Sequence, residues 1–381
     1  MEELAMFLKE KPLSFKVVLV FFLAGLVLAG RSLYVRGTEQ QDEPELIQPV
    51  RVHKPEHVRG VHLSAWVAGS GKLRERVWDL FNATEINTAV IAVKEYEGEV
   101  YIPGVKLAEK YGAYVNAIPD LEKYVAELKA HGVYPVARIV VFKDTILTRK
   151  RPDLAVKRPD GSVWTDRAGN VWLDPYSLEV WDYTFSVADA CVAAGFEEIQ
   201  FDYIRYPSDG DTKQCRYSYA QHNSSSAAAN LGAFLEAANK RYKPLGIYLS
   251  IDIFGLIPSV GNDMGIGQNL EAMSRWVDFV SPMTYPSHYA KGEYGIPEPN
   301  KEPYAVVYRT LSDAKKRMGE DFTKLRPYLQ DFSLFGVHYG PEQVKAQIQA
   351  CYDAGVQDWL LWNPNSRFTK EALRPRTNAV Q

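Results

Sequence analysis

Three aspartates lie where apolar segments typical of buried strands give way to loops. Asp202 lies in the segment EIQFDYIRYP, Asp252 in IYLSIDIF and Asp331 in LRPYLQDF. An ionised carboxylate is costly to bury without a partner, so carboxylates at such positions indicate a site. Two carboxylates that face each other can cleave a glycosidic bond, one as a protonated acid and the other as an ionised nucleophile or base. The pattern therefore predicts a paired-carboxylate hydrolase.

The elements that must position these aspartates repeat along the chain after residue 58. Short apolar segments alternate with amphipathic, helix-like segments, and the last is followed by a short tail at 369–373. The segments that we interpret as strands are 58–66, 89–94, 134–142, 198–207, 247–254, 279–285, 325–332 and 358–363. Near-continuous apolar strands that alternate with helices are typical of a parallel sheet covered by helices.

Eight such units in just over 300 residues predict a (β/α)8 TIM barrel. An open, doubly wound sheet is the alternative architecture. It would need a glycine-rich phosphate-binding turn after an early strand, and Gly69-Ser70-Gly71 is too weak a match to that motif.

In such barrels the active site forms at the C-terminal ends of the strands. Side chains alternate along a strand and neighbouring strands lie about 4.8 Å apart, so we expect Asp202 and Asp252 to face each other across one strand gap. A separation of roughly 5 Å suits a retaining glycosidase and a wider gap suits inversion. The other residues expected at this face, which we predict to bind the substrate, are Trp66, Lys94, Arg138, Arg205, Tyr285, Trp362 and Asn363.

Four segments, YPVARIVVFKD, WLDPYS, FDYIRYP and SPMTYPSHY, resemble a bacterial family of glycoside hydrolase domains, formerly a domain of unknown function. This family is distantly similar to the alpha-amylase superfamily, and the resemblance covers residues 58 to about 368. It implies that Asp202 is the nucleophile, Asp252 the acid/base and Asp331 a helper in the transition state. Two departures from the amylase pattern are Asp252, where that pattern has Glu, and Gln200, where it has Arg.

An unbroken apolar run, VVLVFFLAGLVLAG, occupies residues 17–30 and follows several lysines. A basic flank before a hydrophobic stretch is the layout of a secretory signal or signal anchor, and the lysines place the N-terminus in the cytoplasm. We expect residues 1–35 to form a cytoplasmic tip and a hydrophobic anchor helix, 36–57 a flexible extracytoplasmic tether, and 58–381 the barrel domain. The protein would be a single-pass cell-membrane protein with its catalytic domain outside the cytoplasm, or a secreted protein if the signal is cleaved.

The expected substrate is an extracellular or cell-wall polysaccharide, and a net charge of −3 gives no reason to expect nucleic acid. The three cysteines show no metal-ligand spacing, and we expect no metal or organic cofactor, although Asp144 or Asp174 could hold a calcium ion. Two alternatives stay open. One is a catalytically inactive, glycan-binding barrel, and the other is a lyase that forms a Schiff base through Lys94.

Overall fold

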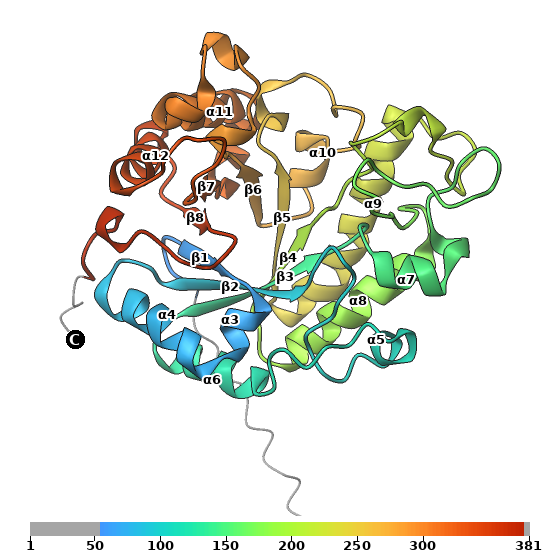
Figure 1. The fold of residues 1–381 in the computed structure, drawn as a ribbon, viewed down its shortest axis with the longest axis horizontal. Helices are drawn as coiled ribbons and strands as arrows, with labels where there is room; N and C mark the ends of the chain where they lie inside the picture. The colour runs from blue at the N-terminus through green and yellow to red at the C-terminus, as the bar shows by residue number, and fades with distance from the viewer. Residues whose placement is uncertain (1–53, 377–381) are drawn as a thin grey trace, which may run out of the picture. The chain divides into compact units, whose positions relative to one another are not determined.

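Eight parallel strands close into a barrel in the computed structural model, which describes residues 54–376 (Figure 1). Each strand pairs with its neighbours in chain order, and the last strand pairs with the first. The strands are β1 (Arg59–Leu63), β2 (Thr88–Lys94), β3 (Tyr134–Val140), β4 (Glu198–Asp202), β5 (Tyr248–Phe254), β6 (Phe279–Met283), β7 (Tyr328–Gln330) and β8 (Trp359–Trp362). The predicted (β/α)8 barrel is confirmed, whereas the predicted anchor helix and most of the tether lie outside the described residues.

Helices surround the strands (Figure 1). They are α3 (Ala65–Gly69), α4 (Gly71–Ala83), α5 (Lys106–Tyr111), α6 (Leu121–Ala130), α7 (Thr145–Lys150), α8 (Leu178–Ala193), α9 (Ser224–Tyr242), α10 (Leu270–Ser274), α11 (Pro303–Met318) and α12 (Pro341–Ala354). The sequence marks several of their ends. A capping box at Asn223 starts α9, and Gly355 ends α12 in the left-handed region. Within residues 54–376, no helix combines the length and apolar character that crossing a membrane requires.

Six of the eight strands end one to five residues earlier than the sequence predicts, and the differences are largest for β1 and β4. Strand β1 stops at Leu63 because the side chain of Ser64 caps the short helix α3, which carries Trp66. Strand β4 stops at Asp202 because Tyr203 adopts a φ of 49°, a conformation that is strained for a bulky residue. The chain therefore turns immediately after Asp202, and Arg205 lies beyond the strand.

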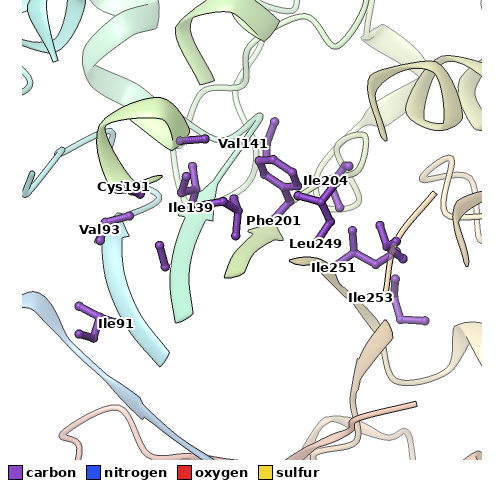
Figure 2. Close-up of a cluster of buried hydrophobic side chains, with 14 of the residues drawn as sticks. Ile91, Val93, Ile139, Val141, Cys191, Phe201, Ile204, Leu249, Ile251 and Ile253 are labelled. Carbon is purple, nitrogen blue, oxygen red and sulfur yellow. The ribbon is translucent and has the colours of Figure 1, made fainter. Parts of the chain in front are cut away.

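Alternation along the strands divides the core into two layers. Odd-numbered residues of β4 and β5 point outward and pack beneath the helices, together with residues of β2, β3 and α8 (Figure 2). The labelled members of this outer layer are Ile91, Val93, Ile139, Val141, Cys191, Phe201, Ile204, Leu249, Ile251 and Ile253. A smaller apolar cluster fills part of the barrel interior, and includes Val90, Tyr134, Val136, Tyr328 and Leu360.

The inward-facing residues of β4 are all polar, in three successive layers along the barrel. Glu198, the deepest, forms an ion pair with Arg326 and accepts a hydrogen bond from the hydroxyl of Ser250 at 2.5 Å. Gln200 is the next inward-facing residue toward the barrel mouth, and it accepts a hydrogen bond from the Tyr328 hydroxyl at 2.7 Å. Asp202 is the third, at the C-terminal end of the strand. The two polar residues below Asp202 therefore have hydrogen-bond partners, and the strand presents the Asp202 carboxylate at the barrel mouth.

Candidate active site

A cavity of about 540 Å³ lies at the C-terminal ends of the strands. The C-terminal face is where barrel enzymes place their chemistry. The predicted site residues that line this cavity are Arg138, Asp202, Arg205, Asp252, Tyr285 and Trp362. The structure thus brings together two of the three predicted catalytic residues and four of the seven predicted substrate-binding residues.

Asp202 has hydrogen-bond partners on both of its carboxylate oxygens. Arg138 donates to Oδ2 from Nε at 2.9 Å and from Nη2 at 2.5 Å. The backbone N–H of Tyr203 donates to Oδ1 at 2.6 Å, a contact that the sharp turn after the strand makes possible. Nη1 of Arg138 contacts Glu95 at 3.1 Å, so the guanidinium joins two carboxylates. Since an arginine side chain stays charged, Asp202 has a permanent cationic partner.

Asp252 lies beside Asp202 but has a different environment. Its side chain is 1% exposed, and its Oδ1 atom has no hydrogen-bond partner among the described residues. Burial, followed by the negative charge of Asp202, raises the pKa of Asp252 well above its usual value, and Arg138 only partly opposes this shift. Burial and the neighbouring charge therefore favour the protonated form of Asp252, which is the form that a general acid needs.

Arg138 also limits the separation of the two carboxyl groups. Its Nε atom lies 2.9 Å from Oδ2 of Asp202 and 4.0 Å from Oδ2 of Asp252, so these oxygens are at most about 7 Å apart. This limit includes the roughly 5 Å spacing of retaining glycosidases and the lower end of the inverting range. The register of β4 and β5, with Gln200 opposite Ser250, places both aspartates on the inward face.

Aromatic side chains form one wall of the cavity. The Trp362 ring lies 5.1 Å from the guanidinium carbon of Arg138 and stacks on His62 with 3.8 Å between ring centroids. Burial, with the charge of Arg138 second, lowers the pKa of His62, so this imidazole is neutral. Burial and then Asp252 raise the pKa values of Tyr285 and Tyr328, so both phenols stay protonated. Such a wall offers a sugar ring an apolar face and the hydroxyl of Tyr285, whereas the Tyr328 hydroxyl already donates to Gln200.

Lys94, which the sequence predicts to bind the substrate, does not line the cavity. The pairing of β2 with β3 shifts register between Ala92 and Lys94. The Lys94 ammonium donates to the Val140 carbonyl at 3.0 Å and lies 2.9 Å from Oδ2 of Asp144, and both side chains are fully buried. A bulge of this kind redirects the side chain that follows it, so Lys94 forms a structural ion pair.

The other predicted residues outside the cavity are Asp331, Asn363 and Trp66. Both oxygens of Asp331 accept hydrogen bonds from Thr369, one from its N–H at 2.8 Å and one from its hydroxyl at 2.6 Å. The side-chain amide of Asn363 donates to the Asp331 carbonyl at 2.5 Å, which ties β8 to the end of β7. Trp66 is 58% exposed on α3 and makes an edge contact with Tyr101. Their predicted roles in catalysis and binding remain predictions.

The two aspartates considered for calcium are engaged by the backbone. Asp144 accepts the Leu147 N–H at 2.7 Å and so caps α7. The two oxygens of Asp174 accept the N–H groups of Tyr176 at 3.0 Å and Ser218 at 2.6 Å. In the part of the chain that the structure describes, no three His, Cys, Asp or Glu side chains are grouped so that they could hold a metal ion.

Residues 60–368 match a family that is described as "Putative glycosyl hydrolase domain". The chain belongs to this family. The resemblance of the four sequence segments is therefore confirmed, and the match covers all eight strands except the first residue of β1. A comparison with curated proteins finds no match.

Solved structures share the fold of this glycosyl hydrolase family member. The PgaB (BpsB) glycoside hydrolase domain from Bordetella bronchiseptica is 13% identical, with a TM-score of 0.61 over 81% of this chain and 95% of that chain. Alpha-L-fucosidase isoenzyme 2 from Paenibacillus thiaminolyticus is 12% identical, with a TM-score of 0.56 over 83% of this chain and 48% of that chain. A hypothetical protein from Ruminiclostridium thermocellum ATCC 27405 is 33% identical over 52% of this chain and 99% of that chain, with a TM-score of 0.46. At 12–13% identity, the first two show a common barrel and nothing of the substrate.

Several cavity residues of this family member carried no signal that singled them out in the sequence. They are Tyr203, Phe254, Met283, Tyr289, Glu293 and Tyr328. Tyr289 and Glu293 come from the long loop after β6, where no periodicity predicts which side chain points inward. Tyr328 could have been found, because it shares the inward face of β7 with Gln330 two residues later, as alternation requires.

Proposed function

We propose that this domain hydrolyses O-glycosidic bonds of an extracellular or cell-wall polysaccharide, with Asp202 and Asp252 as the reacting carboxyl groups. The observation that carries the proposal is that one guanidinium, that of Arg138, reaches both aspartates inside a single cavity at the barrel mouth. It pairs closely with Asp202 and leaves Asp252 buried and protonated. Membership of a family described as glycosyl hydrolases supports the reaction class.

Each aspartate takes the role for which its surroundings suit it. Asp252 donates its proton to the glycosidic oxygen as the bond to the anomeric carbon breaks, so the leaving sugar departs as an alcohol. Asp202 attacks the anomeric carbon and forms a glycosyl ester. Water then attacks the same carbon and gives a proton to Asp252, and Asp202 is released as a carboxylate. This double displacement retains the configuration at the anomeric carbon.

The surroundings of the pair support these roles. The contact of Arg138 with Asp202 stabilises the carboxylate that is regenerated at the end of the cycle. Oδ1 of Asp202 accepts only one hydrogen bond, from the Tyr203 N–H, and so keeps a lone pair for the attack. The aromatic wall around Trp362 offers a face on which a sugar can stack.

The proposed location rests on the apolar run at residues 17–30 and the basic residues around it. That run lies outside the described residues. An anchor at this point places the barrel outside the cytoplasm, where the available substrates are glycans of the cell wall or the surroundings.

A glycan-binding barrel without catalysis is the second candidate, and one observation favours it. Asp331, the helper that the amylase-like pattern implies, is bound to Thr369 and does not line the cavity. The Schiff-base lyase has less support, because the Lys94 ammonium is buried against Asp144 and the cavity lining does not include it.

The test is release of reducing ends by the full chain from a panel of cell-wall and capsular polysaccharides. Replacing Asp252 with asparagine removes a general acid and should lower turnover about 10²–10⁴-fold. Asp202→Asn should abolish turnover but spare binding. Asp182→Asn is the matched control and should keep turnover within about tenfold of wild type, because Asp182 is exposed on α8 and does not line the cavity.

Two results would contradict the proposal. One is a wild-type chain that binds a glycan tightly and releases no reducing ends from it, which would establish the binding barrel. The other is an Asp202→Asn variant with wild-type turnover. The anomer first released, read by proton NMR, checks the retaining course, because an inverted product would require Asp202 to act as a base on water.

A further inference from the structure

Buried arginines in this protein are matched by carboxylates, with one exception. The buried arginines of the described residues and their carboxylate partners are Arg74 with Asp120, Arg138 with Asp202 and Glu95, Arg326 with Glu198, and Arg205 with none. Arg205 is 8% exposed, and no carboxylate oxygen of residues 54–376 lies within ion-pair distance of it. Because a buried charge without a counter-charge is costly, its position at the cavity requires a physical explanation.

Aromatic rings take the place of a counter-ion around Arg205. Its guanidinium carbon lies 4.7 Å from the ring centroid of Trp172, 5.0 Å from that of Tyr203 and 4.6 Å from that of Phe254. Cation–π contacts of this kind offset part of the desolvation cost. They also hold the plane of the guanidinium in a fixed orientation, and two of the three rings, those of Tyr203 and Phe254, line the cavity themselves.

The hydrogen bonds of Arg205 use only one of its three nitrogens. Nη1 donates to the Tyr206 carbonyl at 3.2 Å and to the Ser208 hydroxyl at 3.0 Å. Among the described residues, neither Nε nor Nη2 has an acceptor. These two atoms form one edge of the guanidinium, and that edge matches the two oxygens of a carboxylate. In Arg138 the same two atoms both donate to Oδ2 of Asp202, so this protein already shows this edge of a guanidinium holding a carboxylate.

The charges around this part of the cavity favour an incoming anion. The Lys143 ammonium lies 5.9 Å from the Trp172 ring and 5.3 Å from the Tyr203 ring, so it shares two of the rings that surround Arg205. Burial lowers the pKa of Arg205 to about 10, so the guanidinium stays charged at neutral pH. Of the nearby acids, Asp202 is paired with Arg138, Asp166 lies 3.9 Å from the Lys143 ammonium, and burial favours the protonated form of Asp252. Glu293 lines the cavity as well, from the loop after β6.

We propose that Arg205 binds a carboxylate of the substrate through Nε and Nη2, and that the substrate is an acidic polysaccharide containing uronic acids. Arg205 lies three residues after Asp202 and lines the same cavity, so the carboxylate belongs to a sugar at or next to the bond that is cleaved. The statement about cleavage rests on the proposed function. The statement about binding does not, because an inactive barrel with the same Arg205 would bind the same sugars.

The test compares oligomers of galacturonate, glucuronate and mannuronate with their carboxyl-reduced counterparts, which have the same linkages and no charge. Binding to the full chain is measured by calorimetry. We expect at least one acidic oligomer to bind 10- to 100-fold more tightly than its reduced counterpart, as a charge-assisted pair of hydrogen bonds would give. Arg205→Met keeps the apolar stem and should remove this preference. Arg205→Lys keeps the charge without the fork and should retain part of it.

Arg241 provides the matched control, since its guanidinium is half exposed on α9 and pairs with Asp189 away from the cavity. Arg241→Met should leave the preference for acidic oligomers unchanged. Thermal unfolding shows whether each variant is folded. If Arg205→Met does not fold, the wild-type comparison of acidic with reduced oligomers and the Arg205→Lys variant still decide the matter.

The outcomes separate this inference from the proposed function. Equal binding of acidic and reduced oligomers overturns the inference, even if a neutral glycan is cleaved and the hydrolase proposal holds. Preferential binding of an acidic oligomer that is never cleaved supports the carboxylate site and contradicts hydrolysis. If Arg205→Met still prefers acidic oligomers, another cation binds the carboxylate and the proposed role of Arg205 is wrong. If the wild type binds none of the oligomers, the inference is also overturned.

Discussion

Replacing Asp252 with asparagine tests whether the folded protein resists ionisation of this carboxyl group. The side chain is buried, its Oδ1 has no hydrogen-bond partner among the described residues, and burial and the charge of Asp202 raise its pKa well above the ordinary 3.8. The folded wild type therefore holds this proton more tightly than the unfolded chain does. The resulting stability is fully present below the unfolded pKa and is lost as the pH rises through the folded pKa.

Asparagine cannot ionise, so the Asp252→Asn variant escapes this loss. Each unit of pKa difference corresponds to about 1.4 kcal/mol. The free energy of unfolding of the variant, relative to wild type, should rise by up to about 1.4 kcal/mol per pH unit above pH ~4 and level off above the folded pKa. In a protein of this size each kcal/mol shifts the Tm by roughly 2–4 °C. The variant should be more stable than wild type at pH 8 and almost inactive.

Chemical denaturation of the full chain from pH 4 to pH 8 measures this difference. Asp182→Asn is the control, because Asp182 is exposed on α8 and its replacement should change stability by no more than about 0.5 kcal/mol. The reasoning is refuted if the gap between Asp252→Asn and wild type is the same at every pH. It is also refuted if the variant loses stability relative to wild type as the pH rises.

Three further substitutions test the structure around the cavity. Glu198→Gln leaves Arg326 buried without its counter-charge and should cost about 3–5 kcal/mol of unfolding free energy, measured by urea denaturation; an unchanged midpoint would contradict this. Lys94→Met leaves Asp144 unpaired and should lower the free energy of unfolding by a similar amount. Because the Lys94 ammonium is buried, the wild type should form no adduct with a carbonyl substrate in the presence of borohydride, and an adduct at Lys94 would support the lyase alternative. Trp66→Ala removes a largely exposed ring and should change stability by no more than about 0.5 kcal/mol, while a raised KM would show that the ring contacts substrate.

The barrel could be predicted because each strand and helix carries its own local pattern. Apolar segments, whose strands in the structure are three to seven residues long, alternated with amphipathic ones, and eight repeats left few architectures to consider. The pairing of Asp202 with Asp252 followed from two further regularities. Both residues lie on the inward parity of adjacent strands, and β4 and β5 pair without a register shift.

Some features of the cavity and its surroundings could not be predicted from the sequence. The register shift before Lys94 redirects a side chain whose strand appears regular in sequence. Asp331 follows the inward-facing Gln330, so alternation turns its side chain away from the barrel interior, and both of its carboxylate oxygens contact Thr369, 38 residues later. Glu293 reaches the cavity from a long loop, and the position of a loop side chain depends on the tertiary structure rather than on the loop's own sequence.

The hydrogen bonds between Asp331 and Thr369 affect when the barrel can finish folding during synthesis. Thr369 lies one residue beyond the stretch that matches the family, and the segment after it continues to α4, where Arg376 donates from its backbone N–H to the Ala83 carbonyl. The first strand likewise pairs with the last. A nascent chain from which only the first seven strand–helix units have emerged therefore has an open sheet with two unpaired edges. Such edges are prone to association with other chains. We expect nascent chains of this protein to depend on chaperones until about residue 376 has emerged.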